Sequence, residues 1–387
     1  MKNEHIFASR SIFNHFMNMT MKYDRNVPYN HLPELPPKKE FLDTEVLLAW
    51  GIASRKLAEL NKNVLRIPNP NMLVNTITLR EAKTSAEIEN IFTTDDELYR
   101  ALTVDEEEEK MNPTTKEVLT YREALWEGYR KIQENSGINE EVMIAIFQRI
   151  KSTSLGFRPP QSQTVIRRGN SEFRSGEVVY TPPRGEGIIQ AKVENLLQFM
   201  NDENGIDSLL KMAVAHYQFE AIHPFVDGNG RTGRILNLLY LVNQQLLSHP
   251  VLYLSKYIIQ NKADYYQLLA GVTQRGAWKD WMLYMMKAVE QTASHTNFLV
   301  DQILSQKEAT LTYAKSKLKW YTQELNDHIF AQPYIRQHKI GQILDVSSRT
   351  TLVKYAQQLN DLGILSTRRD GKEVFYVNDE LLNILLD

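Results

Sequence analysis

The sequence predicts a mainly α-helical protein with one small β-hairpin and a C-terminal winged helix-turn-helix. Apolar residues recur at helical spacing through most of residues 44–300, and the clear exception is a β-prone stretch with a turn at residues 163–181. After about residue 325 the pattern changes to helix, turn, helix and two short strands. This is the element order of a winged helix-turn-helix.

Composition and charge indicate a folded chain of two or three domains. Hydrophobic residues make up 42% of the 387 positions and charged residues 24%, which is too apolar for disorder. Lys and Arg number 45 against 47 Asp and Glu, so the net charge of −2 disfavours a strongly basic nucleic-acid-binding protein. The N-terminus does not resemble a signal peptide, and no apolar run is long enough to span a membrane. The lack of cysteine excludes disulfides and thiolate sites. We expect a cytoplasmic protein with no membrane partner.

The first domain is expected at residues 1–112. Its helical patterns cover residues 44–60, 71–81 and 84–92. The last of these begins with a capping signature, in which Thr84 is followed by Glu87 three residues later. The acidic run at residues 105–109 is interpreted as a solvated surface element.

The second domain is expected at residues 113–300 and the third at residues 301–387. Helices are predicted at residues 187–200, 206–222, 231–246, 340–344 and 348–362. Residues 231–246 are apolar on nearly every side, which predicts a central buried helix. In the third domain Gly363 stands where a helix C-cap glycine belongs, and Asp370-Gly371 is a hairpin signal.

Residues 223–234, His-Pro-Phe-Val-Asp-Gly-Asn-Gly-Arg-Thr-Gly-Arg, carry the chemistry. Pro224 cannot easily continue the preceding helix, so His223 is expected at a helix end that faces a loop. The glycines let backbone N–H groups approach a ligand, and the next helix directs its positive dipole end at the same loop. Arg231 and Arg234 lie three apart on the first turn of that helix, so both can reach one anion. Polyphosphate fits this arrangement best.

Three other interpretations of the same residues are weaker. The glycines at 228, 230 and 233 match the spacing of a dinucleotide-binding loop, but they follow a helix rather than a strand. A P-loop would require Lys-Ser/Thr where Arg234-Ile235 stands. His216, Glu220 and His223 share one helix face and offer a zinc site, although His216 and Glu220 could equally form a surface pair.

The stretch 223–234 resembles the signature of the Fic (Fido-fold) family, His-Pro-Phe-x-Asp/Glu-Gly-Asn-Gly-Arg-x-x-Arg, at every fixed position. Further similarity lies in the Pro-rich arm at 29–37, Pro68-Asn-Pro70, the hairpin before Pro182-Pro183, and Tyr265-Tyr266 followed by two tryptophans. The resemblance therefore implies a Fic helical core with a β-hairpin flap, together with the C-terminal winged helix that some members carry.

The resemblance implies transfer of AMP from ATP to a Ser, Thr or Tyr hydroxyl of a target protein, the chain itself included. His223 would be the catalytic base and Asp227 the Mg²⁺ ligand. The residues that would bind ATP are Asp227, Gly228, Asn229, Gly230, Arg231, Thr232, Gly233, Arg234 and Tyr265. Loop N–H groups, Asn229 and Arg231 would stabilise the phosphate oxygens, and Tyr265 would stack on adenine. The flap at 164–168 would pair with the target's backbone. A homodimer is expected by family analogy.

A second motif, Ser85-Ala-Glu-Ile-Glu-Asn90, resembles the family's inhibitory motif Ser/Thr-x-x-x-Glu-Gly/Asn. By this resemblance Ser85, Glu89 and Asn90 form an inhibitory element that precedes the catalytic core. The carboxylate of Glu89 would pair with Arg234 and occupy the place of the γ-phosphate. ATP would then bind only in a pose unsuited to in-line attack.

Alternatives remain open at this stage. The same site could remove AMP, with Glu89 positioning water, or perform both reactions; phosphocholine transfer is a remoter chemistry of the family. The chain could also be a DNA-binding regulator whose core senses nucleotide. Residues 335–378 carry seven Lys or Arg against four Asp or Glu, a modest excess for phosphate binding. A protein-docking or dimer-forming role for the third domain is favoured over DNA binding.

Overall fold

The computed structural model describes residues 23–37, 42–65, 70–103, 111–135, 137–168, 176–370 and 373–386, with the backbone alone at 70–73 and 370. Several predicted features lie outside the described residues: the acidic run at 105–109, Pro68 and Asn69 of the Pro-Asn-Pro element, the hairpin tip at 169–175 and Gly371 of the C-terminal hairpin.

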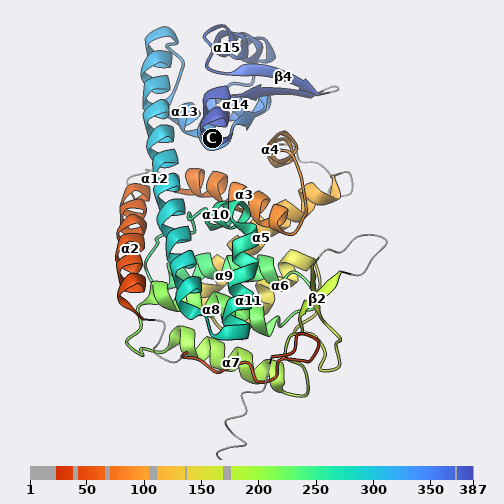
Figure 1. The fold of residues 1–387 in the computed structure, drawn as a ribbon. Helices are drawn as coiled ribbons and strands as arrows, with labels where there is room; N and C mark the ends of the chain where they lie inside the picture. The colour runs from red at the N-terminus through yellow and green to blue at the C-terminus, as the bar shows by residue number, and fades with distance from the viewer. Residues whose placement is uncertain are drawn as a thin grey trace, which may run out of the picture.

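A long helix organises the molecule. Helix α12 (Trp278–Lys317) has 40 residues and runs from the helical core to the C-terminal elements (Figure 1). Helix α2 (Thr44–Val64) lies along α12, starting from an N-cap at Asp43 whose side chain accepts from the Val46 amide. The Lys279 ammonium on α12 lies 2.7 Å from the Asp43 carboxylate, so the two helix starts are adjacent. The first and second predicted domains are therefore packed together.

Residues 70–88 form one helix, α3 (Pro70–Ile88), where the sequence pattern predicts two. The capping signature at Thr84 is the source of the error. Thr84 lies inside the helix, and its hydroxyl bonds the Tyr253 hydroxyl at 2.5 Å instead of capping a new helix. A short connection then leads to α4 (Asp95–Thr103).

The core between these layers is helical. Its members are α5 (Pro113–Glu134), α6 (Glu140–Lys151), α7 (Ile188–Asn201), α8 (Ser208–Ile222), α9 (Asn229–Asn243), α10 (Leu254–Gln260) and α11 (Lys262–Arg275). In α9 every residue except the second and the last is buried, which confirms the predicted central helix. Helix α5 approaches α9 closely at Gly128, where an added Cβ would collide with a methyl group of Leu239.

The predicted flap is an antiparallel pair, β1 (Ile166–Arg168) and β2 (Glu177–Tyr180). Its base is fastened beside the end of α8, because the Tyr180 hydroxyl donates to the Ala221 carbonyl at 2.8 Å. The flap thus begins next to the position of His223.

The C-terminal elements form a unit at the far end of α12 (Figure 1). They are α13 (Gln323–Ile329), β3 (Tyr334–Ile335), α14 (Gln337–Leu344), α15 (Arg349–Asp361), β4 (Ser366–Asp370), β5 (Glu373–Val377) and α16 (Asp379–Leu386). The sheet order is β3-β5-β4, with antiparallel pairing. The predicted helices and hairpin are present, whereas α13, β3 and α16 were not predicted. The winged-helix assignment, DNA binding and the domain boundaries stay predictions, and α12 runs through the boundary placed at residue 300.

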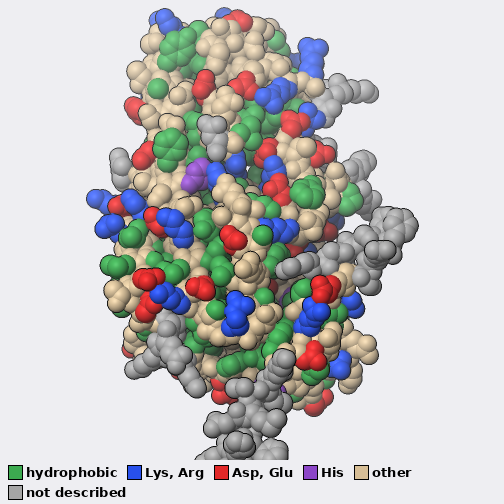
Figure 2. Space-filling model, viewed as in Figure 1, with side chains coloured by type: hydrophobic (Ala, Val, Ile, Leu, Met, Phe, Trp, Pro, Cys, Tyr) green, Lys and Arg blue, Asp and Glu red, His purple; other side chains and the backbone are tan. Residues whose placement is uncertain are grey.

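The surface is mixed in charge and apolar character. In Figure 2, side chains of both charge signs are scattered among apolar ones over the face shown. Within the described stretches, no helix combines the length and apolarity needed to span a bilayer.

Candidate active site

The loop between α8 and α9 has a backbone that its sequence dictates. His223 ends α8 in the left-handed region, with φ 50°. Gly228 has φ 75° and forms the N-cap of α9, a conformation that a side chain would strain. Helix α9 begins at Asn229, two residues earlier than expected. Its free N–H groups therefore face the loop that His223 borders.

Asn229 locks this loop. Its Oδ1 accepts from the Phe225 amide and its Nδ2 donates to the Phe225 carbonyl, both at 2.9 Å. The side chain is 2% exposed. Asn229 therefore shapes the loop, and its direct contact with phosphate stays a prediction. Thr232 acts similarly, since its hydroxyl donates to the Gly228 carbonyl at 2.9 Å.

His223 is held by a residue that the motif does not contain. Arg158, 2% exposed, donates from Nε to the His223 carbonyl at 2.8 Å and also bonds the carbonyl of Pro183, at the end of the flap. Burial and the Arg158 charge lower the pKa of His223 to about 4, against smaller raising effects of the Glu220 carbonyl and the Glu89 and Asp227 carboxylates. The imidazole is therefore neutral near pH 7, the state that accepts a proton.

Asp227 lies at the exposed side of the loop. Its Oδ1 accepts from the Gly228 amide at 2.6 Å, and its Oδ2 lies 2.6 Å from the Lys151 ammonium. Partial burial acts to raise the pKa of the Asp227 carboxyl, but the bonds from Lys151 and Gly228 lower it below its usual value. It is an ionised carboxylate beside a helix N-terminus.

The two signature arginines are both buried, and each has an acidic partner. Arg231, 3% exposed, donates to Glu117 of α5 at 2.9 Å, while its Nε is buried without a hydrogen bond. Arg234, 1% exposed, is surrounded by α3: Nε donates to the Ser85 hydroxyl at 2.7 Å and Nη2 to the Ser85 carbonyl at 2.9 Å. The first two turns of α9 thus carry two buried positive charges, those of Arg231 and Arg234.

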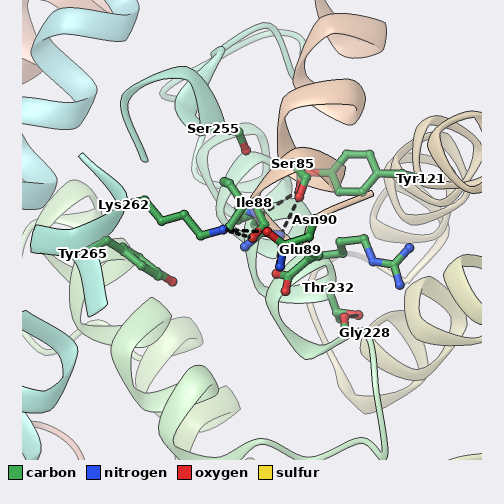
Figure 3. Close-up of polar contacts among 12 residues, drawn as sticks. Ser85, Ile88, Glu89, Asn90, Tyr121, Gly228, Thr232, Ser255, Lys262 and Tyr265 are labelled. Carbon is green, nitrogen blue, oxygen red and sulfur yellow. Dashed lines mark hydrogen bonds and ion pairs between the residues drawn. The ribbon is translucent and has the colours of Figure 1, made fainter. Parts of the chain in front are cut away.

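Glu89 completes the shell of Arg234. Its Oε1 lies 2.8 Å from Arg234 Nη2, and burial notwithstanding, this carboxylate raises the pKa of Arg234 above its usual value. The same oxygen lies so close over Gly230 that an added Cβ there would collide with it. In Figure 3, Glu89 lies between the end of α3 and the start of α9, marked by its N-cap Gly228 and by Thr232. A carboxylate thus lies against the anion-binding turn.

Asn90 shapes the end of this helix. It adopts φ 63°, a left-handed conformation that Asn and Gly tolerate better than other residues. The amides of Glu89 and Ile91 both bond the Ala86 carbonyl, at 2.9 and 3.0 Å. The chain therefore turns sharply after Glu89 and leaves its carboxylate directed at α9.

Two groups on α8 were considered as metal ligands and have other surroundings. His216, 1% exposed, bonds the Tyr265 hydroxyl at 2.9 Å, so the expected surface pair with Glu220 is wrong. Among the residues that the model describes, no cluster of three or more His, Asp or Glu could hold a metal ion. Glu220 has an oxygen without a hydrogen bond, 2.6 Å from where a Cβ of Gly233 would lie, and burial raises its pKa to about 7.

Tyr265 lies deeper than expected. It is 2% exposed and packs against Trp281 and Tyr284, with ring centroids 5.8 and 6.2 Å apart. Its neighbour Tyr266 is 39% exposed and feels the charges of Glu89 and Arg234. Tyr266 is thus the more exposed of the two rings, and the stacking of Tyr265 on adenine stays a prediction.

The assembled site joins an exposed ionised carboxylate, a neutral histidine and a helix N-terminus flanked by buried guanidinium groups. Such a site can bind a polyphosphate with its metal and accept a proton from a nucleophile beside it. Sequence reasoning found the contiguous loop and the pair of Glu89 and Arg234. It missed Arg158, Lys151 and Glu117, which no local motif marks.

Three segments of the chain match family models. Residues 47–130 match the Fic/DOC family N-terminal model and residues 137–241 the Fic/DOC family model. Residues 304–381 match a model described as the C-terminal domain of SoFic-like protein adenylyltransferases.

Curated relatives match over shorter stretches. The chain is 28% identical to the protein adenylyltransferase fic-1 of Caenorhabditis elegans over 145 residues, which cover 36% of this chain and 27% of that protein. It is 28% identical to a probable protein adenylyltransferase of Aquifex aeolicus (strain VF5) over 187 residues, 47% of this chain and 53% of the relative. The chain thus spans about a quarter to a half of the length of these relatives.

A solved structure shares the fold. A Fic family protein from Desulfovibrio desulfuricans G20 superposes with a TM-score of 0.54 at 17% identity, over 89% of this chain and 98% of that one. The likeness shows a common fold, and the three matched segments, which follow one another along most of the chain, show that the protein belongs to the Fic family.

Proposed function

We propose that the protein is an adenylyltransferase that moves AMP from ATP to a hydroxyl side chain of a protein, and that Glu89 inhibits it. The names of the curated relatives support the reaction class. The ion pair between Glu89 and Arg234, at 2.8 Å against the first turns of α9, is the observation that carries the inhibition.

In the proposed reaction His223 accepts the proton and the start of α9 stabilises the phosphate charge. The acceptor hydroxyl gives its proton to the neutral imidazole of His223 while its oxygen attacks the α-phosphorus of ATP. A new P–O bond forms, the bond between the α-phosphorus and pyrophosphate breaks, and pyrophosphate leaves. The N–H groups at the start of α9 and the buried Arg231 stabilise the charge on the phosphate oxygens.

The residues present fit a Mg²⁺ ion at the phosphates. Asp227 is an exposed, ionised carboxylate at the border of the anion site, and Mg²⁺ is commonly held by one or two carboxylates together with substrate phosphates. Bound there, Mg²⁺ would neutralise charge on the phosphates. Lys151, which now pairs with Asp227, would have to exchange its partner or share it.

Inhibition follows from competition for Arg234. Arg234 is the cation expected to hold the outer phosphates, and it is occupied by Ser85 and Glu89. The Glu89 carboxylate also fills the space above Gly230, where a phosphate oxygen would meet the backbone. Two negative groups cannot share this place, so ATP is held in an unproductive pose while Glu89 is present.

The test is the initial rate of AMP incorporation from α-labelled ATP. We expect Glu89→Gly to raise the rate strongly, by about 10²-fold, because a shift on the ångström scale changes rates by this factor. Adding Arg234→Ala should remove the gain. Glu87→Gly is the matched control, since Glu87 lies on the same helix turn but 3.8 Å from Lys83 rather than at Arg234. Equal rates in wild type and Glu89→Gly would contradict the proposal.

Removal of AMP by the same site is a second candidate. The Glu89 carboxylate lies over Gly230, in the turn that follows the loop which His223 borders, so the two groups could act together on a water molecule. Release of AMP from a pre-labelled target by wild type, and its loss in Glu89→Gly, would support this reaction. If wild type releases no AMP, removal of AMP is excluded and AMP transfer is the only reaction proposed for the site.

A further inference from the structure

Lys262 of α11 contacts the end of α3, the helix that carries the proposed inhibitory motif. It is the first residue of α11, and its Nζ donates to the Ile88 carbonyl at 2.6 Å and to Oδ1 of Asn90 at 3.5 Å (Figure 3). The two contacted residues are the immediate neighbours of Glu89. The ammonium group therefore holds the Ile88 backbone and the Asn90 side chain, on either side of the residue whose carboxylate pairs with Arg234.

Elementary helix chemistry explains why this contact matters. The last carbonyls of a helix have no partner within the helix, and its C-terminus carries a partial negative charge that attracts cations. The backbone bonds of this turn use the Ala86 and Glu87 carbonyls, while the Ile88 carbonyl accepts from Lys262. Helix α3 has no basic residue of its own in its last turn. Lys262 supplies that cation from α11.

Apart from the apolar packing of Ile88, which is buried, the other hydrogen bonds described for α3 side chains lie about one turn or more earlier. Thr84 bonds Tyr253, and Glu81 accepts from the Ser255 amide at 2.9 Å. These bonds fix the body of the helix but not the turn after Ile88, where the chain enters the left-handed conformation at Asn90. The polar contacts that hold the Glu89 carboxylate are thus Arg234 at its tip and Lys262 at its base, beside the packing of Ile88 in the core.

We propose that Lys262 is a positioning residue for inhibition: by capping the Ile88 carbonyl and Asn90 it holds Glu89 on Arg234. This inference rests on the proposed inhibitory function of Glu89. Without the ammonium group, the last turn would fray and Glu89 would occupy the phosphate position for a smaller fraction of time. Lys262 then sets how strongly the enzyme is inhibited, although it does not touch the reacting atoms.

The experiment compares Lys262→Met and Lys262→Arg in the wild-type and Glu89→Gly backgrounds. Met keeps the aliphatic stem but not the donor, and Arg keeps both donor and charge. Lys262→Met should raise the initial rate of AMP incorporation about 3- to 10-fold in the wild-type background, the factor that corresponds to one hydrogen bond. Lys262→Arg should stay near the wild-type rate. In the Glu89→Gly background Lys262→Met should change nothing, because no carboxylate is left to position.

Lys192→Met is the matched control, since Lys192 likewise donates to a backbone carbonyl, that of Leu32 at 2.7 Å, away from α3. Amide hydrogen exchange provides a readout besides activity: Glu89 and Ile91 should exchange faster in Lys262→Met and not in Lys192→Met. An unchanged rate and unchanged exchange in Lys262→Met would overturn the inference, as would an equal gain in both backgrounds. If Glu89→Gly itself fails to raise the rate, inhibition by Glu89 is refuted, and faster exchange would show only that Lys262 holds the helix end.

Discussion

At His223, burial beneath the loop and the Arg158 guanidinium favour the neutral imidazole, with a pKa of about 4. We expect the rate of AMP transfer to be insensitive to His223 protonation between about pH 6 and 8 and to fall below about pH 5, as the base takes up its proton. A pH profile of kcat/KM with Glu89→Gly enzyme measures this. Because the unfolded chain protonates its histidines near pH 6.5, the free energy of unfolding should also decrease as the pH is lowered from about 6.5 to about 4.

His223→Ala should lower AMP transfer by about 10²- to 10⁴-fold, the usual loss when a general base is removed. Binding of ATP, measured by calorimetry, should change little because the base touches the acceptor rather than the phosphates. Undiminished labelling would assign the base to another residue.

Asp227 should determine the dependence on Mg²⁺. Asp227→Ala removes the ionised oxygen and releases Lys151, so we expect Mg²⁺ to stop strengthening ATP binding in calorimetric titrations with and without the metal. AMP transfer should be lost at every Mg²⁺ concentration. A variant that keeps metal-dependent turnover would place the metal elsewhere.

Site residues that are close together along the chain could be predicted from the sequence, whereas those far apart along the chain could not. The loop could be predicted because its glycines, proline and arginines dictate a local backbone. Arg158 lies 65 residues from His223, and Lys262 lies 174 residues from Ile88. Only tertiary packing brings these pairs together, and a single sequence holds no local signal for it.

At the scale of elements, helix type was easier to predict than helix limits. The apolar circumference of α9 marked it as the central helix. Thr84 was wrongly given a cap because its hydroxyl and Glu87 have the spacing of a capping box, yet in the fold that hydroxyl bonds Tyr253 of the neighbouring segment. Tertiary contacts thus overrode a valid local signal.

The crossing of α5 and α9 depends on Gly128. Gly128→Ala should lower the free energy of unfolding by about 1–3 kcal/mol, because the added Cβ meets Leu239 and Ile146 in a packed interior. Urea unfolding measures the change. Gly51→Ala in α2 is the control: nothing lies within 4 Å of its added Cβ, and Ala is favoured over Gly in a helix by about 0.5–1 kcal/mol, so it should stabilise. Equal effects of the two changes would refute the role given to the crossing.

Across the whole molecule, the C-terminal unit contacts α4, the helix that follows α3. The Tyr334 hydroxyl donates to Asp96 of α4 and accepts from Arg368 at 2.8 Å. The rings of Tyr334 and Tyr99 stack, with centroids 6.0 Å apart. On α3 itself, the Thr76 hydroxyl donates to the Ala331 carbonyl at 3.0 Å. The C-terminal unit and the N-terminal helices are therefore joined by side chains as well as by α12.

Tyr334→Phe should weaken this junction. It removes the donor to Asp96 and the acceptor for Arg368 while keeping the stacked ring, so we expect a loss of about 0.5–1.5 kcal/mol in the free energy of unfolding. Amide exchange in α4 should increase with it. If α4 exchange stays at the wild-type level, the contact does not hold the two parts together.

The Asn229 clamp has a consequence for the thermodynamics of nucleotide binding. Since both of its amide atoms bond the Phe225 backbone, the protein's own contacts hold the loop in its closed shape. Ordering a backbone costs about 1–2 kcal/mol per residue in conformational entropy. For this loop the cost is part of the free energy of folding and not of nucleotide binding. Phosphate thus enters a rigid cradle, and the free energy of its contacts is not diminished by ordering of the loop. Binding should then be accompanied by only a small change in the loop's mobility.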